Sequence, residues 1–149
     1  MSSVETVGTS QSAVPAASKL RMPSVLSCGL TIVLIKASLK ILGFAGTLDW
    51  IRRRVQTIPQ TVLADIDDLR VADHSVALAG ALYPGRARCL EQSLTLYYVL
   101  RCRGVPVRYC HGVQPYPFQA HAWIEYGDVI LSDVPEHARQ FSRLPDQLP

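Results

Sequence analysis

The chain has 149 residues, the length of a single domain with a short extension, which excludes large multidomain machines. Hydrophobic residues make up 48% of the sequence and charged residues 18%, a composition too apolar for a wholly disordered protein. The formal net charge is only +3, so we expect no nucleic-acid partner on electrostatic grounds. Partners must therefore be inferred from individual sites.

Residues 1–20 are rich in Ser, Thr, Ala and Val and are predicted to be a disordered tail. They do not combine a basic stretch, a short apolar stretch and a small-residue cleavage site, as a secretory signal does. We therefore expect a cytoplasmic protein. In the reducing cytoplasm, the four cysteines are expected to act as small buried residues, ligands or nucleophiles and not as disulfides.

Residues 21–60 are predicted to form an apolar and basic helical segment. The stretch from Val25 to Leu48 is long enough to cross a bilayer, but Lys36 and Lys40 interrupt its apolar run. This pattern favours a helix that packs on this protein or on a partner. An interfacial membrane helix and a true span remain alternatives, and a peripheral membrane contact would use residues 25–54.

Residues 61–149 are predicted to form the main domain. Apolar residues recur at three-and-four spacing from Thr61 to Leu82, which predicts a helix. A second helix is predicted from Cys89 to Cys102, and the glycine and proline that follow it are typical of a helix end.

The hydrophobic period then changes to two, which predicts strands. One strand is expected over residues 107–113, and two more over residues 120–126 and 129–134, where they flank Gly127 and Asp128 as a hairpin. The expected fold class is therefore α+β, with N-terminal helices followed by a small antiparallel sheet.

Three reactive residues fall at useful places in these elements. Cys89 opens a helix, where unsatisfied amides and the helix dipole stabilise a thiolate nucleophile. His121 lies six residues before Gly127 and Asp133 six residues after it, so a tight hairpin would bring them to the same level of neighbouring strands. The carboxylate could then orient the imidazole toward Cys89, as in a Cys-His-Asp triad.

The same three residues also have a plain structural interpretation. Cys89 would be a small buried residue, His121 a satisfied strand histidine and Asp133 a turn cap, and spacing alone does not decide between the two. The cysteines and histidines show no paired CxxC or HxxxH spacing, so we expect no metal. His111 and His137 lie outside the predicted hairpin and are expected to be structural or exposed.

The second half of the chain, from Tyr83 to Phe141, contains a set of short motifs: Pro84-Gly85-Arg86, Cys89-Leu90-Glu91, Arg103-Gly104-Val105-Pro106, Gly112-Val113, Phe118-Gln119-Ala120-His121-Ala122-Trp123 and Asp133. With these motifs, it resembles the transglutaminase-like cysteine peptidases of lasso peptide biosynthesis, the B-type leader peptidases. Gln119 departs from the family pattern, in which an acidic residue is more usual. The resemblance implies a transglutaminase/papain-like core with Cys89 as nucleophile, His121 as general base and acid, and Asp133 as the orienting carboxylate.

The resemblance also implies a substrate and partners. Such peptidases remove the leader from a ribosomally made precursor peptide and need no cofactor, and a separate ATP-dependent lasso cyclase closes the macrolactam. No strand-rich segment that could bind a leader is predicted in the first half, so we expect a separate leader-recognition protein. A transglutaminase-like acyltransferase, a noncatalytic scaffold for precursor and cyclase, and a membrane-associated protein with an incidental cysteine remain alternatives.

Overall fold

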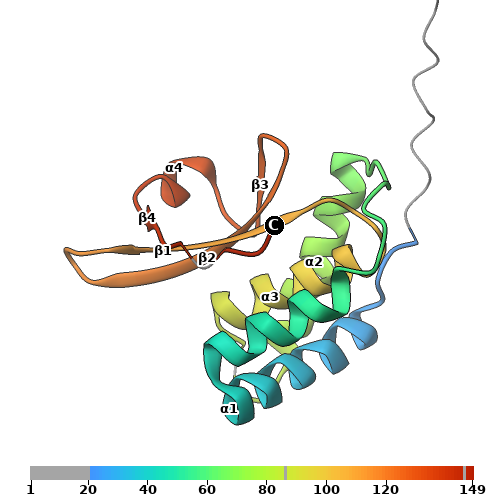
Figure 1. The fold of residues 1–149 in the computed structure, drawn as a ribbon, viewed down its shortest axis with the longest axis horizontal. Helices are drawn as coiled ribbons and strands as arrows, with labels where there is room; N and C mark the ends of the chain where they lie inside the picture. Colours follow the sequence, from blue (N-terminus) through green and yellow to red (C-terminus); the bar gives the residue numbers. More distant parts are fainter. Residues whose placement is uncertain (1–20, 86, 146) are drawn as a thin grey trace, which may run out of the picture.

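The computed structural model describes residues 21–149 except residues 86 and 146, so the predicted tail over residues 1–20 lies outside it. Three helices form one layer, and a sheet of four antiparallel strands with a short helix forms the other (Figure 1). In chain order the elements are α1 (Val25–Val55), α2 (Ile66–Leu82), α3 (Cys89–Arg101), β1 (Arg108–Gln114), β2 (Gln119–Tyr126), β3 (Val129–Leu131), α4 (Pro135–Ala138) and β4 (Ser142–Arg143). The strand order is β3-β2-β1-β4. The predicted α+β class is confirmed.

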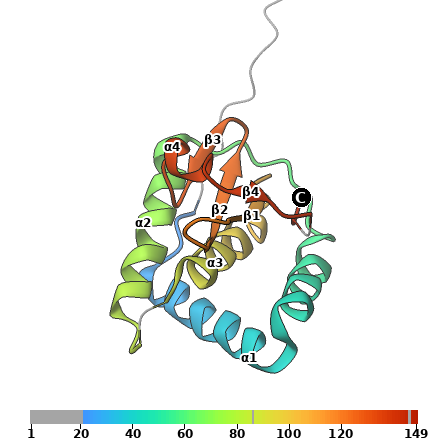
Figure 2. The same cartoon turned by 90° about the vertical axis from the view of Figure 1, so that its left-hand side faces the viewer.

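Helix α1 is bent at Gly43, whose backbone is non-helical (φ 70°, ψ −176°). Glycine adopts a positive φ at no steric cost, which explains the position of the bend. Beyond it, the Thr47 hydroxyl donates to the Gly43 carbonyl at 2.7 Å and lies 3.1 Å from the Ser38 hydroxyl on the first arm. Figure 2 shows the two arms running in different directions around α3.

One face of α1 is part of the core and the other is exposed. Cys28, Ile32 and Ile35 are fully buried in the cluster that also contains the inner residues of α2, α3 and the sheet. Leu26 and Ile41 are more than three-quarters exposed on the outer face. By length and composition alone, α1 is long and apolar enough to cross a membrane. Within the protein, 17% of its most apolar stretch is buried.

Helix α2 begins at Ile66 and not at Thr61, so the predicted start was five residues too early. The preceding backbone amides bond to distant parts of the chain: Val62 donates to the carbonyl of Gly104, and Ala64 donates to the hydroxyl of Tyr126. Asp65 then caps the helix by accepting from the amide of Asp67 at 3.1 Å. These tertiary bonds replace the first helical turn that the periodicity predicted.

Helix α3 packs against the inner face of the sheet. The hydroxyl of Ser93 is buried and donates to the carbonyl of Ala122 on β2 at 2.9 Å, which fixes the N-terminal half of α3 against that strand. Gly112 on β1 allows β4 to approach closely, because a Cβ there would meet the Ser142 carbonyl at 2.7 Å. The bond between Ser93 and Ala122 therefore holds the start of α3 against the middle of β2.

Candidate active site

Cys89 is the first residue of α3, and its side chain is exposed. The carboxylate of Glu91 accepts a hydrogen bond from the Arg88 amide at 2.8 Å, which satisfies a free donor at the helix start. Lys36 of α1 lies 3.6 Å from the same carboxylate. These contacts fix the helix end that carries the thiol.

The other three cysteines are separate from this position. Cys28 is buried in α1, Cys110 is buried on β1, and Cys102 is exposed beyond the opposite end of α3. All four thiols are free.

Cys89 and His121 line the same cavity, which has a volume of about 220 Å³ and a mostly apolar wall. It lies between the bend of α1, the start of α3 and strands β1 and β2. Its lining residues are Phe44, Cys89, Leu90, Tyr109, His111, Gly112, Val113, Ala120, His121, Ala122 and Leu144. The nucleophile and base predicted from the sequence thus share one apolar pocket.

Tyr109 supplies a polar group to this pocket. Its side chain is fully buried, and its hydroxyl has no hydrogen-bond partner among the described residues. Burial, and secondarily the negative charge of a Cys89 thiolate, raise the pKa of the Tyr109 phenol. The hydroxyl therefore keeps its proton at neutral pH and can donate a hydrogen bond.

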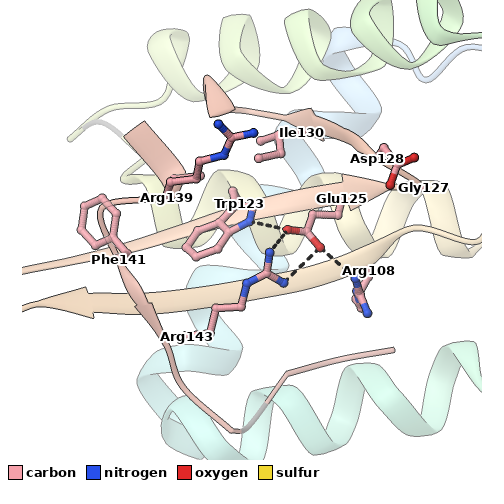
Figure 3. A pocket seen from close by; sticks show the side chains of 10 residues that line it. Arg108, Trp123, Glu125, Gly127, Asp128, Ile130, Arg139, Phe141 and Arg143 are labelled. Atoms are coloured by element: carbon pink, nitrogen blue, oxygen red, sulfur yellow. Dashed lines mark hydrogen bonds and ion pairs between the residues drawn. The ribbon is translucent and has the colours of Figure 1, made fainter. Parts of the chain in front are cut away.

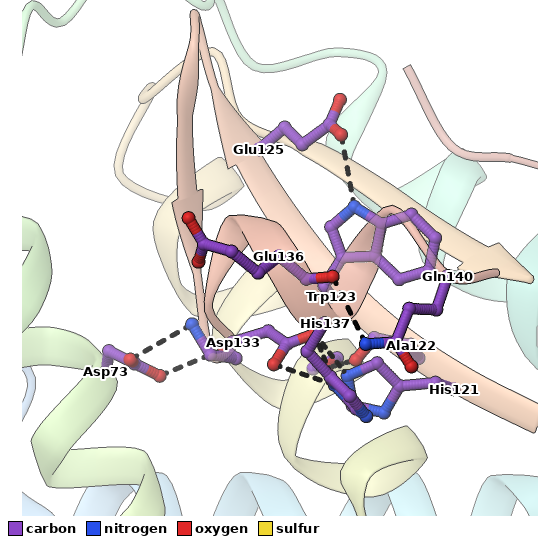
Figure 4. Close-up of polar contacts among 11 residues, drawn as sticks. Asp73, His121, Ala122, Trp123, Glu125, Asp133, Glu136, His137 and Gln140 are labelled. Atoms are coloured by element: carbon purple, nitrogen blue, oxygen red, sulfur yellow. Dashed lines mark hydrogen bonds and ion pairs between the residues drawn. The ribbon is translucent and has the colours of Figure 1, made fainter.

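His121 is held by Asp133. The Nε2 atom of His121 lies 2.9 Å from Oδ2 of Asp133, and both side chains are largely buried (Figure 4). Trp123 stacks beside the imidazole with ring centroids 6.1 Å apart, and Phe141 lies 5.2 Å from it. Asp133 engages Nε2, so Nδ1 is the ring nitrogen that makes no contact with that carboxylate.

The hairpin that carries His121 and Asp133 differs from its prediction. Strand β3 ends at Leu131 and not at residue 134. The pairs Tyr126↔Val129 and Ile124↔Leu131 confirm the expected turn at Gly127 and Asp128, but they are offset by one residue from the count that placed His121 and Asp133 at the same level. Continued pairing would have placed Asp133 opposite Ala122. Instead Ser132 adopts a left-handed conformation (φ 66°), the strand stops, and Asp133 reaches His121 from the following loop.

Asp73 on α2 anchors this loop, a role that was not predicted. Its carboxylate accepts from both the amide and the hydroxyl of Ser132, at 3.1 and 2.9 Å (Figure 4). The two bonds fix the residue immediately before Asp133. They join positions 59 residues apart, which is why no local sequence pattern reveals them.

His137 on α4 is a second partner of Asp133, although it was expected to be structural or exposed. Its Nδ1 atom lies 3.0 Å from both carboxylate oxygens, and its ring centroid is 4.8 Å from that of His121. The signal for this contact was the four-residue spacing between Asp133 and His137 at the start of a helical turn.

A second cavity, of about 470 Å³, lies on the outer face of the sheet (Figure 3). Its centre is the buried carboxylate of Glu125, which accepts hydrogen bonds from Trp123, Arg108 and Arg143. Burial opposes the charge of Glu125, but the bonds from Arg143, Trp123 and Arg108 outweigh it and lower its pKa to about 2. Residues 121, 123 and 125 share one face of β2, so this network lies on the same face as His121 and reaches it through Trp123.

Replacing Glu125 with glutamine is expected to destabilise the protein by about 2–3 kcal/mol at neutral pH. The folded pKa lies below the ordinary value, so the carboxylate stabilises the fold above pH 4.5 and this contribution is lost as the pH falls toward 2. Urea unfolding of both proteins across this range measures the difference. A stability gap that stayed constant from neutral to acidic pH would contradict the ionic origin of the effect.

Comparison with known proteins identifies a protein family. The family model described as the transglutaminase-like superfamily matches residues 31–146, from α1 to the C-terminal segment. No curated protein sequence and no solved structure matches the chain significantly.

Proposed function

This chain belongs to the transglutaminase-like superfamily, and on that basis we propose that it is a cysteine peptidase that removes the leader from a lasso precursor peptide. The superfamily covers both cysteine peptidases and acyltransferases. The observation that carries the proposal is the cavity shared by Cys89 and His121, with Nε2 of His121 engaged by Asp133. This arrangement provides a nucleophile, a base and an orienting group for acyl transfer.

In the proposed mechanism, His121 accepts the thiol proton at Nδ1 and the Cys89 sulfur attacks the scissile carbonyl. The backbone amide of Cys89, at the start of α3, stabilises the oxyanion, and the protonated hydroxyl of Tyr109 is available as a further donor. The tetrahedral intermediate collapses when the C–N bond breaks and His121 protonates the leaving amine. Water, deprotonated by His121, then hydrolyses the thioester and regenerates the thiol.

The substrate and partners follow from the resemblance of residues 83–141 to lasso leader peptidases. The enzyme is proposed to act in the cytoplasm with a separate leader-recognition protein and an ATP-dependent lasso cyclase. Within the described part of the chain, the strands belong to the single sheet that carries His121, which leaves no further strand-rich module for leader binding. The exposed outer face of α1, with Leu26, Leu30 and Ile41, is the surface we assign to partner docking, with a peripheral membrane contact as the alternative.

The test is mass spectrometry of a precursor peptide encoded beside this gene, incubated with the protein in the presence and absence of the leader-recognition protein. Cleavage at the junction of leader and core would support the peptidase, and dependence on the second protein would support recognition in trans. Amine incorporation in place of hydrolysis would instead indicate an acyltransferase. Absence of any reaction with folded protein would favour the noncatalytic scaffold.

Asp73→Ala is expected to lower kcat by about 100-fold with little change in KM, because Ser132 and hence Asp133 lose their anchor on α2. Loss of the two bonds should also destabilise the fold by about 1–3 kcal/mol. Steady-state kinetics and urea unfolding measure the two effects separately. Asp67→Ala is the matched control, since Asp67 is exposed on the same helix. Equal kinetics in both variants would exclude a positioning role for Asp73.

A further inference from the structure

Asp133 is the shared partner of two imidazoles. Nε2 of His121 and Nδ1 of His137 lie 2.9 and 3.0 Å from its carboxylate, and one ligand atom from each residue lies within 4.8 Å of the others. Two histidines and one carboxylate make up a set of ligands that binds Zn²⁺ in hydrolytic enzymes. We propose that His121, Asp133 and His137 form a Zn²⁺ site whose occupation inactivates the peptidase.

The two contacts of Asp133 with the histidines are close to the ligand spacing of a zinc centre, and the two histidine nitrogens lie within 4.8 Å of each other. A tetrahedral ion bound at ~2.0–2.2 Å from each ligand places the ligand atoms about 3.3 Å apart. The two contacts with Asp133 are shorter than this by only a few tenths of an ångström, because hydrogen atoms now occupy the positions between nitrogen and oxygen. Small rotations of the side chains would open the space that the ion requires.

The ion can enter from the side of His137. The side chain of His137 is 41% exposed, whereas those of His121 and Asp133 are 14% and 10% exposed. The expectation of no metal rested on short paired spacings, and these ligands instead come from β2, from the loop after β3 and from α4. The tertiary fold creates the site.

Binding would remove His121 from catalysis. A metal on Nε2 displaces the hydrogen from that nitrogen, and the neutral ring then carries its hydrogen on Nδ1. Nδ1 can no longer accept the proton of Cys89, so the thiol is not activated. This consequence rests on the proposed peptidase function, whereas metal binding itself does not.

The binding test uses the full chain with Cys89→Ala and Cys102→Ser, which removes the two exposed thiols. Isothermal titration with Zn²⁺ should show one site with a micromolar or lower dissociation constant, and titration with Co²⁺ should give visible absorption bands typical of nitrogen and oxygen ligands. Adding His137→Ala should weaken binding by at least about 10-fold. Adding His74→Ala is the matched control, because His74 is exposed on α2, and should leave binding unchanged.

Equal Zn²⁺ affinity in the His137→Ala and His74→Ala proteins would overturn the site, whether or not the protein cleaves a precursor. Circular dichroism of each variant would show that a loss of binding does not arise from unfolding. His137→Asn serves as a second variant if the alanine protein is unfolded.

Inactivation by Zn²⁺ is tested in proteins that retain Cys89. The measured quantity is the ratio of the cleavage rates with and without Zn²⁺. The wild type should be inhibited at the concentration that fills the site, and His137→Ala should require at least about 10-fold more Zn²⁺. Equal inhibition of both proteins would overturn the proposal by assigning the effect to the Cys89 thiol. If no cleavage occurs without metal, the peptidase function fails, while the titration still decides the metal site.

Discussion

Replacing Cys89 with alanine is expected to abolish leader cleavage, with a fall in kcat/KM on the order of 10⁴-fold or more. The sulfur is the atom that forms the thioester, and no other thiol lines the cavity that contains His121. The side chain is exposed, so the free energy of unfolding should change by no more than about 0.5 kcal/mol. Binding of the precursor and the leader-recognition protein should persist.

Cys102→Ala is the matched control for this experiment. Cys102 is also free and exposed, but it lies at the other end of α3. Mass spectrometry of the wild type and the two variants, with and without the partner, separates the roles of the thiols. Cleavage by the Cys89→Ala protein at a rate near that of the wild type would eliminate Cys89 as the nucleophile.

Asp133→Asn is expected to lower kcat by about 10³–10⁴-fold with a much smaller effect on KM. The carboxylate accepts from Nε2 of His121 and so leaves Nδ1 without a hydrogen, ready to accept the thiol proton. An asparagine amide can donate to Nε2 instead, which stabilises the tautomer with its hydrogen on Nδ1. The substrate-binding wall of the cavity is unchanged because Asp133 does not line it.

Single-turnover cleavage and precursor binding, measured separately, test this prediction. Asp128→Asn is a suitable control, since Asp128 is exposed in the turn of the same hairpin. A kcat close to that of the wild type in the Asp133→Asn protein would show that His121 is oriented by other contacts.

Much of the architecture could be predicted from local patterns. The helix predicted from Cys89 to Cys102 is present as Cys89–Arg101, and the change of hydrophobic period from 3.6 to 2 marks the passage from helices to the sheet. The placement of Cys89 at a helix start follows from the same local signals. These features depend on neighbours in sequence, which a pattern can detect.

The position of Asp133 could not be derived in this way. Counting from the turn assumed that β3 continued to residue 134, but Ser132 leaves the strand because Asp73, far away in the chain, binds both its amide and its hydroxyl. Asp133 does lie beside His121, as the count predicted, but it reaches the imidazole from a loop and not from a paired strand position. The early start predicted for α2 has the same origin, because the amides of Val62 and Ala64 bond to Gly104 and Tyr126.

Part of the wall of the cavity comes from segments outside α3, β2 and the loop after β3. Phe44 comes from just beyond the bend of α1 and Leu144 from just after β4, whereas Cys89, His121 and Asp133 are held by α3, β2 and the loop after β3. Phe44 and Leu144 can therefore vary without moving the groups proposed to react. Under the proposed function, exchanging these two hydrophobic residues would change the substrate preference while the reacting groups keep their alignment, so a change of substrate need not pass through an inactive ancestor.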